Sequence, residues 1–220
     1  MIKYLAIIPA RKNSKRIKRK NLVKIKNKKM FYYTLDAAKK TKEIKKIVIT
    51  TDIKELLKKN TNRLIYIKRP KQLTRDHCST ESAIFHVIKY VKQIMKLEIE
   101  NIIILQPTSP FRNSKDIKVA IKFFEKGKYD SLFSAFEDKM SIWKYKNKNY
   151  NPITYNLKKR KREQDSKSLI IENGAIYIFN IKKFLLHKVR LFGKIGCFLM
   201  NKKSSIEIDD NFDLHLAKNI

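Results

Sequence analysis

The residues best suited to chemistry lie in one basic segment near the start of the chain. Arg11 and Lys20 can bracket an anionic group, and Ser14 and Asn21 add neutral hydrogen-bonding side chains. We expect the apolar run at 4–8 to be a buried strand, and open α/β sheets bind ligands where such strands end. The segment has no glycine, so side chains rather than backbone amides must neutralise a phosphate chain. The pattern predicts a phosphate-binding loop, with a solvated basic turn as the alternative.

An acidic run near the other end of this basic chain is the second candidate. In the order Glu207, Ile208, Asp209, the two carboxylates point to the same side of an extended segment and are close enough to share a hard cation such as Mg²⁺. A bound metal would complete the phosphate site that the basic segment begins. The alternative is that Asp209 or Asp210 only caps the last helix.

A loop in the middle of the chain supplies a third set of polar side chains. It reads QPTSPFR, residues 106–112, and follows the most apolar run of the chain, which we expect to be the central strand because strands covered on both faces form continuous apolar runs. Its two prolines lack amide donors. We therefore expect recognition to fall to the side chains of Gln106, Thr108, Ser109 and Arg112.

The elements that must position these residues alternate between strands and helices. We expect further strands at 46–52, 64–68, 102–105, 130–137, 172–179 and 196–200, with Gly174 as the turn that leads into the fifth. We expect helices at 31–42, 55–59, 79–96, 114–126, 181–187 and 212–218, with Ser79 or Thr80 as the cap of the third. This alternation predicts an α/β fold with a doubly wound, mainly parallel sheet and helices on both faces.

The segment 139–167 interrupts the alternation. It is polar, rich in Tyr, Asn and Lys, and too long for a simple connection. We expect a small irregular excursion that serves the active site or dimerisation, within a single domain spanning 1–220.

The composition is strongly basic, with a formal net charge of +32 over 220 residues. Such a surface attracts nucleic acid and anionic membranes electrostatically. Because the lysines are spread along the whole chain, we expect weak, nonspecific nucleic-acid binding and no specific nucleic-acid partner. A basic nucleic-acid-binding protein stays as the alternative from another functional class.

The cysteines and the hydropathy of the chain bear on the cellular compartment of the protein. Cys78 and Cys197 are far apart and have no metal-binding spacing, which argues against a disulfide scaffold or a zinc site. The amino terminus does not follow the order of a secretory signal, and no stretch reaches about 18 uninterrupted apolar residues. We expect a cytoplasmic protein that binds no membrane.

Six segments resemble, in order and spacing, those of the acylneuraminate cytidylyltransferases, also called CMP-N-acetylneuraminic acid synthetases. They read IIPARKNSKRIKRKN, VITTD, RPKQLTRD, LQPTSPFRNSKDI, ENGAIYIF and IEIDDNFDL, and the resemblance extends from Ala6 to Ala217. It implies a Rossmann-like homodimer that uses Mg²⁺ and CTP to activate a nine-carbon α-keto acid sugar, giving a CMP-sugar for surface glycans and pyrophosphate. Sialic or legionaminic acid is the implied acceptor, and pseudaminic acid or an eight-carbon ulosonic acid is the alternative.

The resemblance also implies roles for individual residues. Arg11, Ser14, Lys20 and Asn21 would hold the triphosphate and ribose, and Arg69, Thr80 and Gln106 would line the nucleotide pocket. Gln106, Lys144, Arg162, Asn173 and Tyr177 would contact the sugar, and Glu207 and Asp209 would bind Mg²⁺. Arg11 and Lys20 would stabilise the α-phosphate and the departing pyrophosphate, while the proton of the anomeric hydroxyl would pass to Asp209 or to a metal-bound hydroxide. Packing in the core or at an interface is the alternative for Tyr177.

Three positions depart from the family pattern. Arg16 stands where glycine is usual, which adds charge and removes conformational freedom. Glu207 stands where aspartate is usual, which shifts the reach of the carboxylate by one methylene. The family's run of two arginines, glutamine and aspartate reads KREQD at 161–165, so the sugar contact is ambiguous by one position. These departures leave a nucleotide binder without turnover as a third interpretation.

Overall fold

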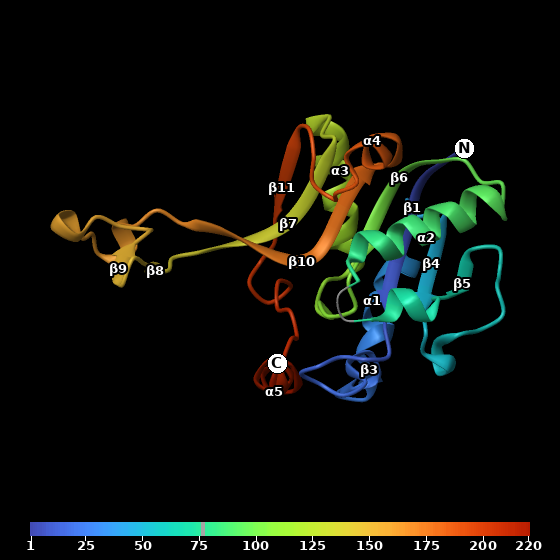
Figure 1. Ribbon diagram of the computed structural model, residues 1–220, viewed down its shortest axis with the longest axis horizontal. Coiled ribbons are helices and arrows are strands. Elements are labelled where there is room, and N and C mark those ends of the chain that lie inside the picture. The colour runs from blue at the N-terminus through green and yellow to red at the C-terminus, as the bar shows by residue number, and fades with distance from the viewer. Residues whose placement is uncertain (76–77) are drawn as a thin grey trace.

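The computed structural model describes residues 1–75 and 78–220, so Asp76, the last residue of the RPKQLTRD segment, lies outside the described residues. A seven-stranded sheet forms the centre of the protein, in the order β11-β7-β10-β6-β1-β4-β5 (Figure 1). Its strands are β1 (Ile2–Ala10), β4 (Lys46–Thr51), β5 (Leu64–Lys68), β6 (Ile99–Leu105), β7 (Ser131–Asp138), β10 (Leu169–Asn180) and β11 (Ile195–Leu199).

The sheet is mainly parallel, which confirms the prediction. β1 pairs in parallel with β4 and β6, β4 pairs in parallel with β5, and β7 pairs in parallel with β11. β10 runs antiparallel to both of its neighbours, β6 and β7. The chain enters β10 directly after the excursion that leaves β7, and an antiparallel neighbour needs no crossover helix.

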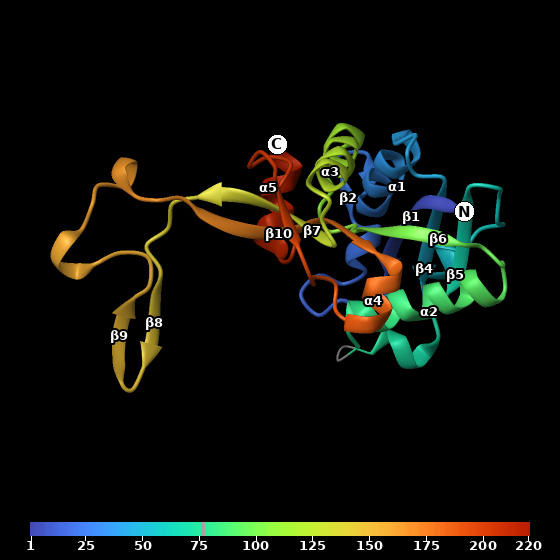
Figure 2. The same cartoon turned by 90° about the horizontal axis from the view of Figure 1, so that it is seen from above.

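Helices cover both faces of this sheet (Figure 2). They are α1 (Met30–Lys40) and α3 (Ser114–Gly127) on one face, and α2 (Thr80–Gln93) and α4 (Ile181–His187) on the other. Alternate residues of β1 serve the two sides, because Ala6 and Ile8 join one core cluster and Leu5 and Ile7 join the other. The predicted doubly wound arrangement is therefore confirmed.

Polar side chains cap the starts of α2 and α3. Ser79 accepts a hydrogen bond from the amide of Ser82 and caps α2, as predicted. Asn113 and Asp116 form a capping box at the start of α3. Among the described residues, no helix has the length and apolar character needed to cross a membrane.

The last helix, α5 (Asn211–Asn219), lies beside the short hairpin of β2 (Lys24–Ile25) and β3 (Lys28–Lys29). Asp210 caps it by accepting from the amides of Phe212 and Asp213, and Asp213 bonds back to the amide of Asp210. The cap is therefore Asp210 and not Asp209, which leaves the Asp209 carboxylate to other partners.

Two local predictions are wrong. The helix expected at 55–59 is only a 3-10 turn, Lys54–Leu56, because Lys58 and Lys59 are exposed and give a further turn nothing to pack against. Gly174 does not lead into a strand, since it lies within β10 with a φ of 65°, where the pairing with β7 shifts register. Glycine adopts this conformation at low cost, so Gly174 places an irregularity in β10 beside the end of β6.

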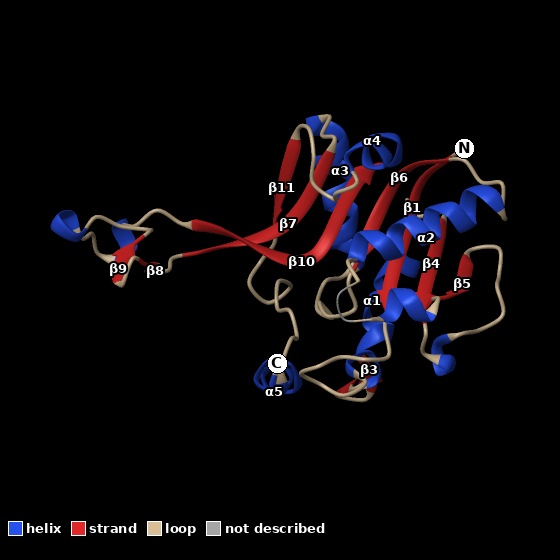
Figure 3. Cartoon of the chain, viewed as in Figure 1, coloured by secondary structure: helices blue, strands red, loops and turns tan. Residues whose placement is uncertain are grey.

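The excursion at 139–167 is an arm that projects from the ends of β7 and β10 (Figures 1 and 3). It is more regular than predicted, because β8 (Trp143–Lys146) and β9 (Asn149–Pro152) form an antiparallel hairpin. Two 3-10 turns follow at Leu157–Lys159 and Glu163–Asp165. The hairpin exposes large aromatic side chains, including Tyr145 at 61% and Tyr150 at 66%, which is typical of a surface that a partner covers.

Candidate active site

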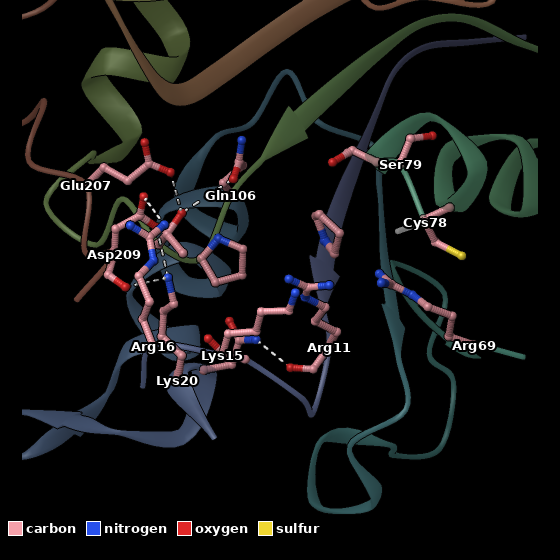
Figure 4. Close-up of a pocket in the computed structure, with 17 residues that line it drawn as sticks. Arg11, Lys15, Arg16, Lys20, Arg69, Cys78, Ser79, Gln106, Glu207 and Asp209 are labelled. Carbon is pink, nitrogen blue, oxygen red and sulfur yellow. Dashed lines mark hydrogen bonds and ion pairs between the residues drawn. The ribbon is translucent and has the colours of Figure 1, made fainter. Parts of the chain in front are cut away.

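The carboxyl ends of β1 and β6 meet at a cavity of about 370 Å³ (Figure 4). In the figure, Glu207 and Asp209 stand on one side of this cavity, Arg69 on the other, and Arg11 between them. All residues predicted to hold the nucleotide line it, namely Arg11, Ser14, Lys20, Asn21, Arg69, Thr80 and Gln106. The structure thus brings the basic segment and the acidic run, which are far apart in the chain, to a single site.

The basic segment folds around the cavity without glycine. The side-chain amide of Asn21 donates to the carbonyl of Arg11 at 2.8 Å and ties the ends of the loop together. Ile17 is 5% exposed and packs in a small core with Ile25 and Met30. Ile17 and Asn21 therefore fix the loop. Asn21 lines the cavity, but its side-chain amide group is hydrogen-bonded to the backbone.

Lys20 and Asp209 form the central ion pair of the site. The side chain of Lys20 is 11% exposed, and its Nζ lies 2.9 Å from Oδ1 of Asp209 and 3.0 Å from the carbonyl oxygen of Ile208. Arg16 holds the other carboxylate oxygen of Asp209, Oδ2, at 2.8 Å. Burial favours a raised pKa for Asp209, but Lys20 and Arg16 outweigh it and lower the pKa. Asp209 is therefore a carboxylate at neutral pH.

Glu207 has a different environment on the same wall. Its Oε1 accepts a hydrogen bond from the hydroxyl of Thr108 at 3.1 Å, and burial, reinforced by the charge of Asp209, raises its pKa. A methyl group on Gly174 would lie 3.1 Å from Oε1 of Glu207 and 3.3 Å from Nε2 of Gln106. The bare glycine backbone therefore allows the carboxylate and the Gln106 amide to approach the same point.

Arg69 and the start of α2 form the opposite wall. Arg69 is 7% exposed, and its Nη2 donates to the carbonyl of Thr50 at 3.1 Å. Thr80 opens α2 immediately after its cap, Ser79, and both residues line the cavity. Amides in the first turn of a helix attract anions, so this wall adds positive potential without a further formal charge.

The predicted sugar contacts Lys144 and Arg162 lie outside the cavity of their own chain. Both are exposed on the arm, Lys144 in β8 and Arg162 in a loop, where its Nε bonds Oδ2 of Asp165 at 3.0 Å. The arm extends away from the sheet (Figure 2). These two cations can meet a sugar at such a cavity only if the arm reaches the cavity of another chain.

Asn173 and Tyr177 are also placed away from the cavity. Asn173 is 3% exposed, accepts from Ser134 Oγ at 2.6 Å and donates to Ser205 Oγ at 2.9 Å. Tyr177 is 4% exposed, its hydroxyl donates to Glu172, and it packs in the core beneath α2 and α4. The core alternative for Tyr177 thus matches its position, and Gln106 is the one predicted sugar contact among the described residues that lines the cavity.

The loop at 106–112 agrees with its prediction for two of the four side chains. Gln106 and Thr108 line the cavity, but Ser109 and Arg112 are 0% and 1% exposed and do not reach it. Arg112 turns inward because carbonyl groups and a hydroxyl accept its hydrogen bonds there. The sequence did not point to Gly174, whose lack of a side chain lets the Glu207 carboxylate and the Gln106 amide come close. Its only sign in the sequence is the glycine within the segment ENGAIYIF.

The carboxylate pair fits a magnesium ion that also has ligands from a substrate. Within the described residues, no group of three or more His, Cys, Asp or Glu side chains is arranged to hold a metal. Mg²⁺ is usually held by one or two carboxylates, with phosphates and water as its other ligands. Glu207 and Asp209 supply hard oxygen atoms of this kind on one wall of the cavity.

Sequence similarity to proteins named as cytidylyltransferases covers almost the whole chain. The chain is 33% identical, over 98% of its length, to the N-acylneuraminate cytidylyltransferase of Escherichia coli O18:K1:H7, and it spans about half of that relative, 51%. It is 27% identical to the pseudaminic acid cytidylyltransferase of Campylobacter jejuni serotype O:23/36, a match that covers 99% of this chain and 95% of that protein.

A solved structure and a family model complete the comparison. The 4-diphosphocytidyl-2C-methyl-D-erythritol synthase of Anaerococcus prevotii superposes with a TM-score of 0.67 at 16% identity, covering 99% of this chain and 97% of that one, which supports the Rossmann-like fold. The family model described as Cytidylyltransferase matches residues 5–218. This match includes both the basic segment and the acidic run, and the chain therefore belongs to the cytidylyltransferase family.

Proposed function

We propose that the protein transfers a cytidylyl group from CTP to a nine-carbon α-keto acid sugar of the sialic or legionaminic acid type, giving a CMP-sugar and pyrophosphate. The observation that carries this proposal is the single cavity in which Arg11, Lys20 and Arg69 face the carboxylates of Glu207 and Asp209. Cations on several sides suit a triphosphate, and paired carboxylates suit the metal that accompanies it. The 33% identity to an N-acylneuraminate cytidylyltransferase supports the acceptor class.

The residues that line the cavity have separate roles in the proposed phosphoryl transfer. Such reactions depend on positioning and on neutralising charge, so Arg11 and Lys20 stabilise the α-phosphate and the leaving pyrophosphate. Lys20 already lies in the cavity, held by the carbonyl of Ile208 and the carboxylate of Asp209, and it would exchange that carboxylate for a phosphate oxygen. Gln106 orients the sugar, whose anomeric hydroxyl attacks the α-phosphate. Asp209, ionised because its pKa is lowered, is able to take the proton of that hydroxyl.

Glu207 and Asp209 would hold Mg²⁺ in this proposal. A bound magnesium ion supplies Lewis-acid stabilisation of the phosphate oxygens. The protein contributes a partly buried, hydrogen-bonded Glu207 and an Asp209 whose charge Lys20 and Arg16 balance.

We further propose that the protein is a homodimer in which the arm of one chain reaches the cavity of the other. The exposed aromatic residues of the hairpin and the position of Lys144 and Arg162 on the same arm support this arrangement. These two cations would then bind the sugar carboxylate across the interface. We place the reaction in the cytoplasm, as a step toward lipopolysaccharide or capsule glycans.

Pseudaminic acid is the second candidate acceptor, supported by the relative that the chain matches over 99% of its length. The deciding experiment measures magnesium-dependent pyrophosphate release from CTP with N-acetylneuraminic, legionaminic, pseudaminic and eight-carbon ulosonic acids as separate acceptors. Release with one acceptor, lost in Asp209→Ala and in Arg11→Ala, is the expected result. A folded protein that binds CTP but releases no pyrophosphate with any of them contradicts the proposal.

A further inference from the structure

Arg112 is a buried cation that the proposed chemistry does not use. It is 1% exposed, and all its hydrogen-bond partners among the described residues are neutral: the carbonyl oxygens of Gln106 and Ala175 at 3.4 and 3.1 Å, and the hydroxyl of Thr34 at 2.6 Å. Burial lowers the pKa of Arg112 to about 9, which reflects the cost of a desolvated charge. Buried charges are weak sources of stability, so the arrangement indicates a role other than stability.

The three partners of Arg112 lie on three different elements that meet at the cavity. Gln106 follows β6 and lines the cavity, and Thr34 of α1 donates a second hydrogen bond to the Gln106 carbonyl at 3.3 Å. Ala175 of β10 follows Gly174, against which the Glu207 carboxylate and the Gln106 amide rest. Arg112 therefore links the carbonyl of Gln106 to the carbonyl of Ala175, next to the irregularity of β10.

We propose that Arg112 is a positioning residue for the acceptor sugar, which fixes Gln106 and the Gly174 irregularity so that the Gln106 amide meets the sugar in one orientation. The inference rests on the proposed function, in which Gln106 contacts the sugar. Arginine suits this task because its planar guanidinium has donors in a fixed fork that reaches separate acceptors at once. A lysine ammonium on a flexible stem cannot hold the same two carbonyl groups in register.

The test is a double-mutant cycle with Arg112→Met and Gln106→Ala, measured as kcat and KM for CTP and for the acceptor. We expect Arg112→Met to lower kcat/KM for the acceptor by about tenfold to a hundredfold, the scale of a misplaced contact, with the KM for CTP changed by less than about twofold. In the Gln106→Ala background the same change should have almost no further effect, because its route of action is gone. Equal effects in both backgrounds would overturn the inference.

Arg63→Met is the matched control. Arg63 also donates to neutral carbonyl groups, those of Thr41 and Ile44 at 2.8 and 3.0 Å, but it lies away from the cavity. This variant should leave both KM values and kcat unchanged. If Arg112→Met does not fold, Thr34→Val removes one partner of Arg112 together with one donor to the Gln106 carbonyl, and it should lower kcat/KM for the acceptor in the same selective way. An unchanged value in Thr34→Val would then overturn the inference.

A readout without turnover separates this inference from the proposed function. The chain has only four glutamines, so selective ¹⁵N-glutamine labelling gives four side-chain amide signals, of which Gln72, Gln93 and Gln164 are internal controls. We expect Arg112→Met to shift or broaden the Gln106 signal alone. If the wild-type protein is silent with every acceptor but this signal responds, the proposed function fails and the positioning contact stands. If the wild-type protein is active and the Gln106 signal does not respond, only the positioning role fails.

Discussion

Replacing Lys20 with methionine removes the cation that links the acidic run to the basic segment. The Nζ of Lys20 lies 2.9 Å from Oδ1 of Asp209, and the lysine side chain is 11% exposed. At this distance and an effective dielectric constant of about 20, the Coulomb attraction is about 4–6 kcal/mol before desolvation is subtracted. Asp209 is 41% exposed and keeps Arg16 at 2.8 Å, so we expect a net loss of only about 1–2 kcal/mol in the free energy of unfolding. That loss corresponds to a fall of about 2–8 °C in Tm for a chain of this length.

The same substitution should affect activity far more than stability. If Lys20 contacts the triphosphate in the transition state, its loss should lower kcat/KM for CTP by about 100- to 1000-fold. Lys202→Met is the control, because the Nζ of Lys202 pairs with Asp138 at 2.7 Å but the lysine side chain is 68% exposed. This control should cost less than about 1 kcal/mol and leave activity intact. Thermal unfolding and magnesium-dependent pyrophosphate release measure both effects. A Lys20→Met enzyme with wild-type kcat/KM for CTP would refute the assignment of the phosphate wall.

Three further predictions address the other parts of the site. Burial and the neighbouring Asp209 raise the pKa of Glu207, so its ionisation lowers the free energy of unfolding as the pH rises through that pKa. In metal-free protein, calorimetry should therefore give Glu207→Gln a higher Tm than wild type at about pH 7 but not at about pH 4. Gly174→Ala should lose about 1–3 kcal/mol of stability, since φ is 65° and the new methyl group presses on the Glu207 carboxylate, and an unchanged Tm would show that β10 relaxes there. Mixed dimers of Arg162→Ala and Asp209→Ala chains should regain pyrophosphate release that neither homodimer shows, whereas silence in the mixture would place Arg162 outside the site.

The fold and one half of the site follow from local sequence patterns. Continuous apolar runs identify the central strands, and helix periodicity identifies the covering helices, because both signals depend on near neighbours in the chain. The basic segment and the acidic run were correctly predicted to lie at one site. They meet because the segment follows β1 directly, while the backbone around Ile208 bonds to Thr108 of the loop after β6 and leaves Glu207 and Asp209 on the cavity side.

The positions of the residues expected to contact the sugar are harder to predict, for physical reasons. The positive φ of Gly174 shifts the register of β10, so simple alternation no longer tells which face Asn173 and Tyr177 occupy. Arg112 turns inward because carbonyl groups from distant elements accept its donors, a contact that no local pattern shows. The direction of the arm depends on how β7 and β10 extend beyond the sheet, which residue types do not specify.

The ion pairs around Asp209 also predict that CTP and Mg²⁺ bind cooperatively. Lys20 and Arg16 neutralise Asp209, but a triphosphate needs those cations and a magnesium ion needs that carboxylate. Either ligand alone must leave a charged group without its partner, whereas both together exchange one set of ion pairs for another. We therefore expect each ligand to tighten the other by about 5- to 150-fold in calorimetric titrations. Arg16→Gly, which restores the residue usual in the family, should reduce that coupling because Asp209 then has one cation fewer to release. Equal CTP affinity with and without Mg²⁺ would show that these ion pairs persist in the complex.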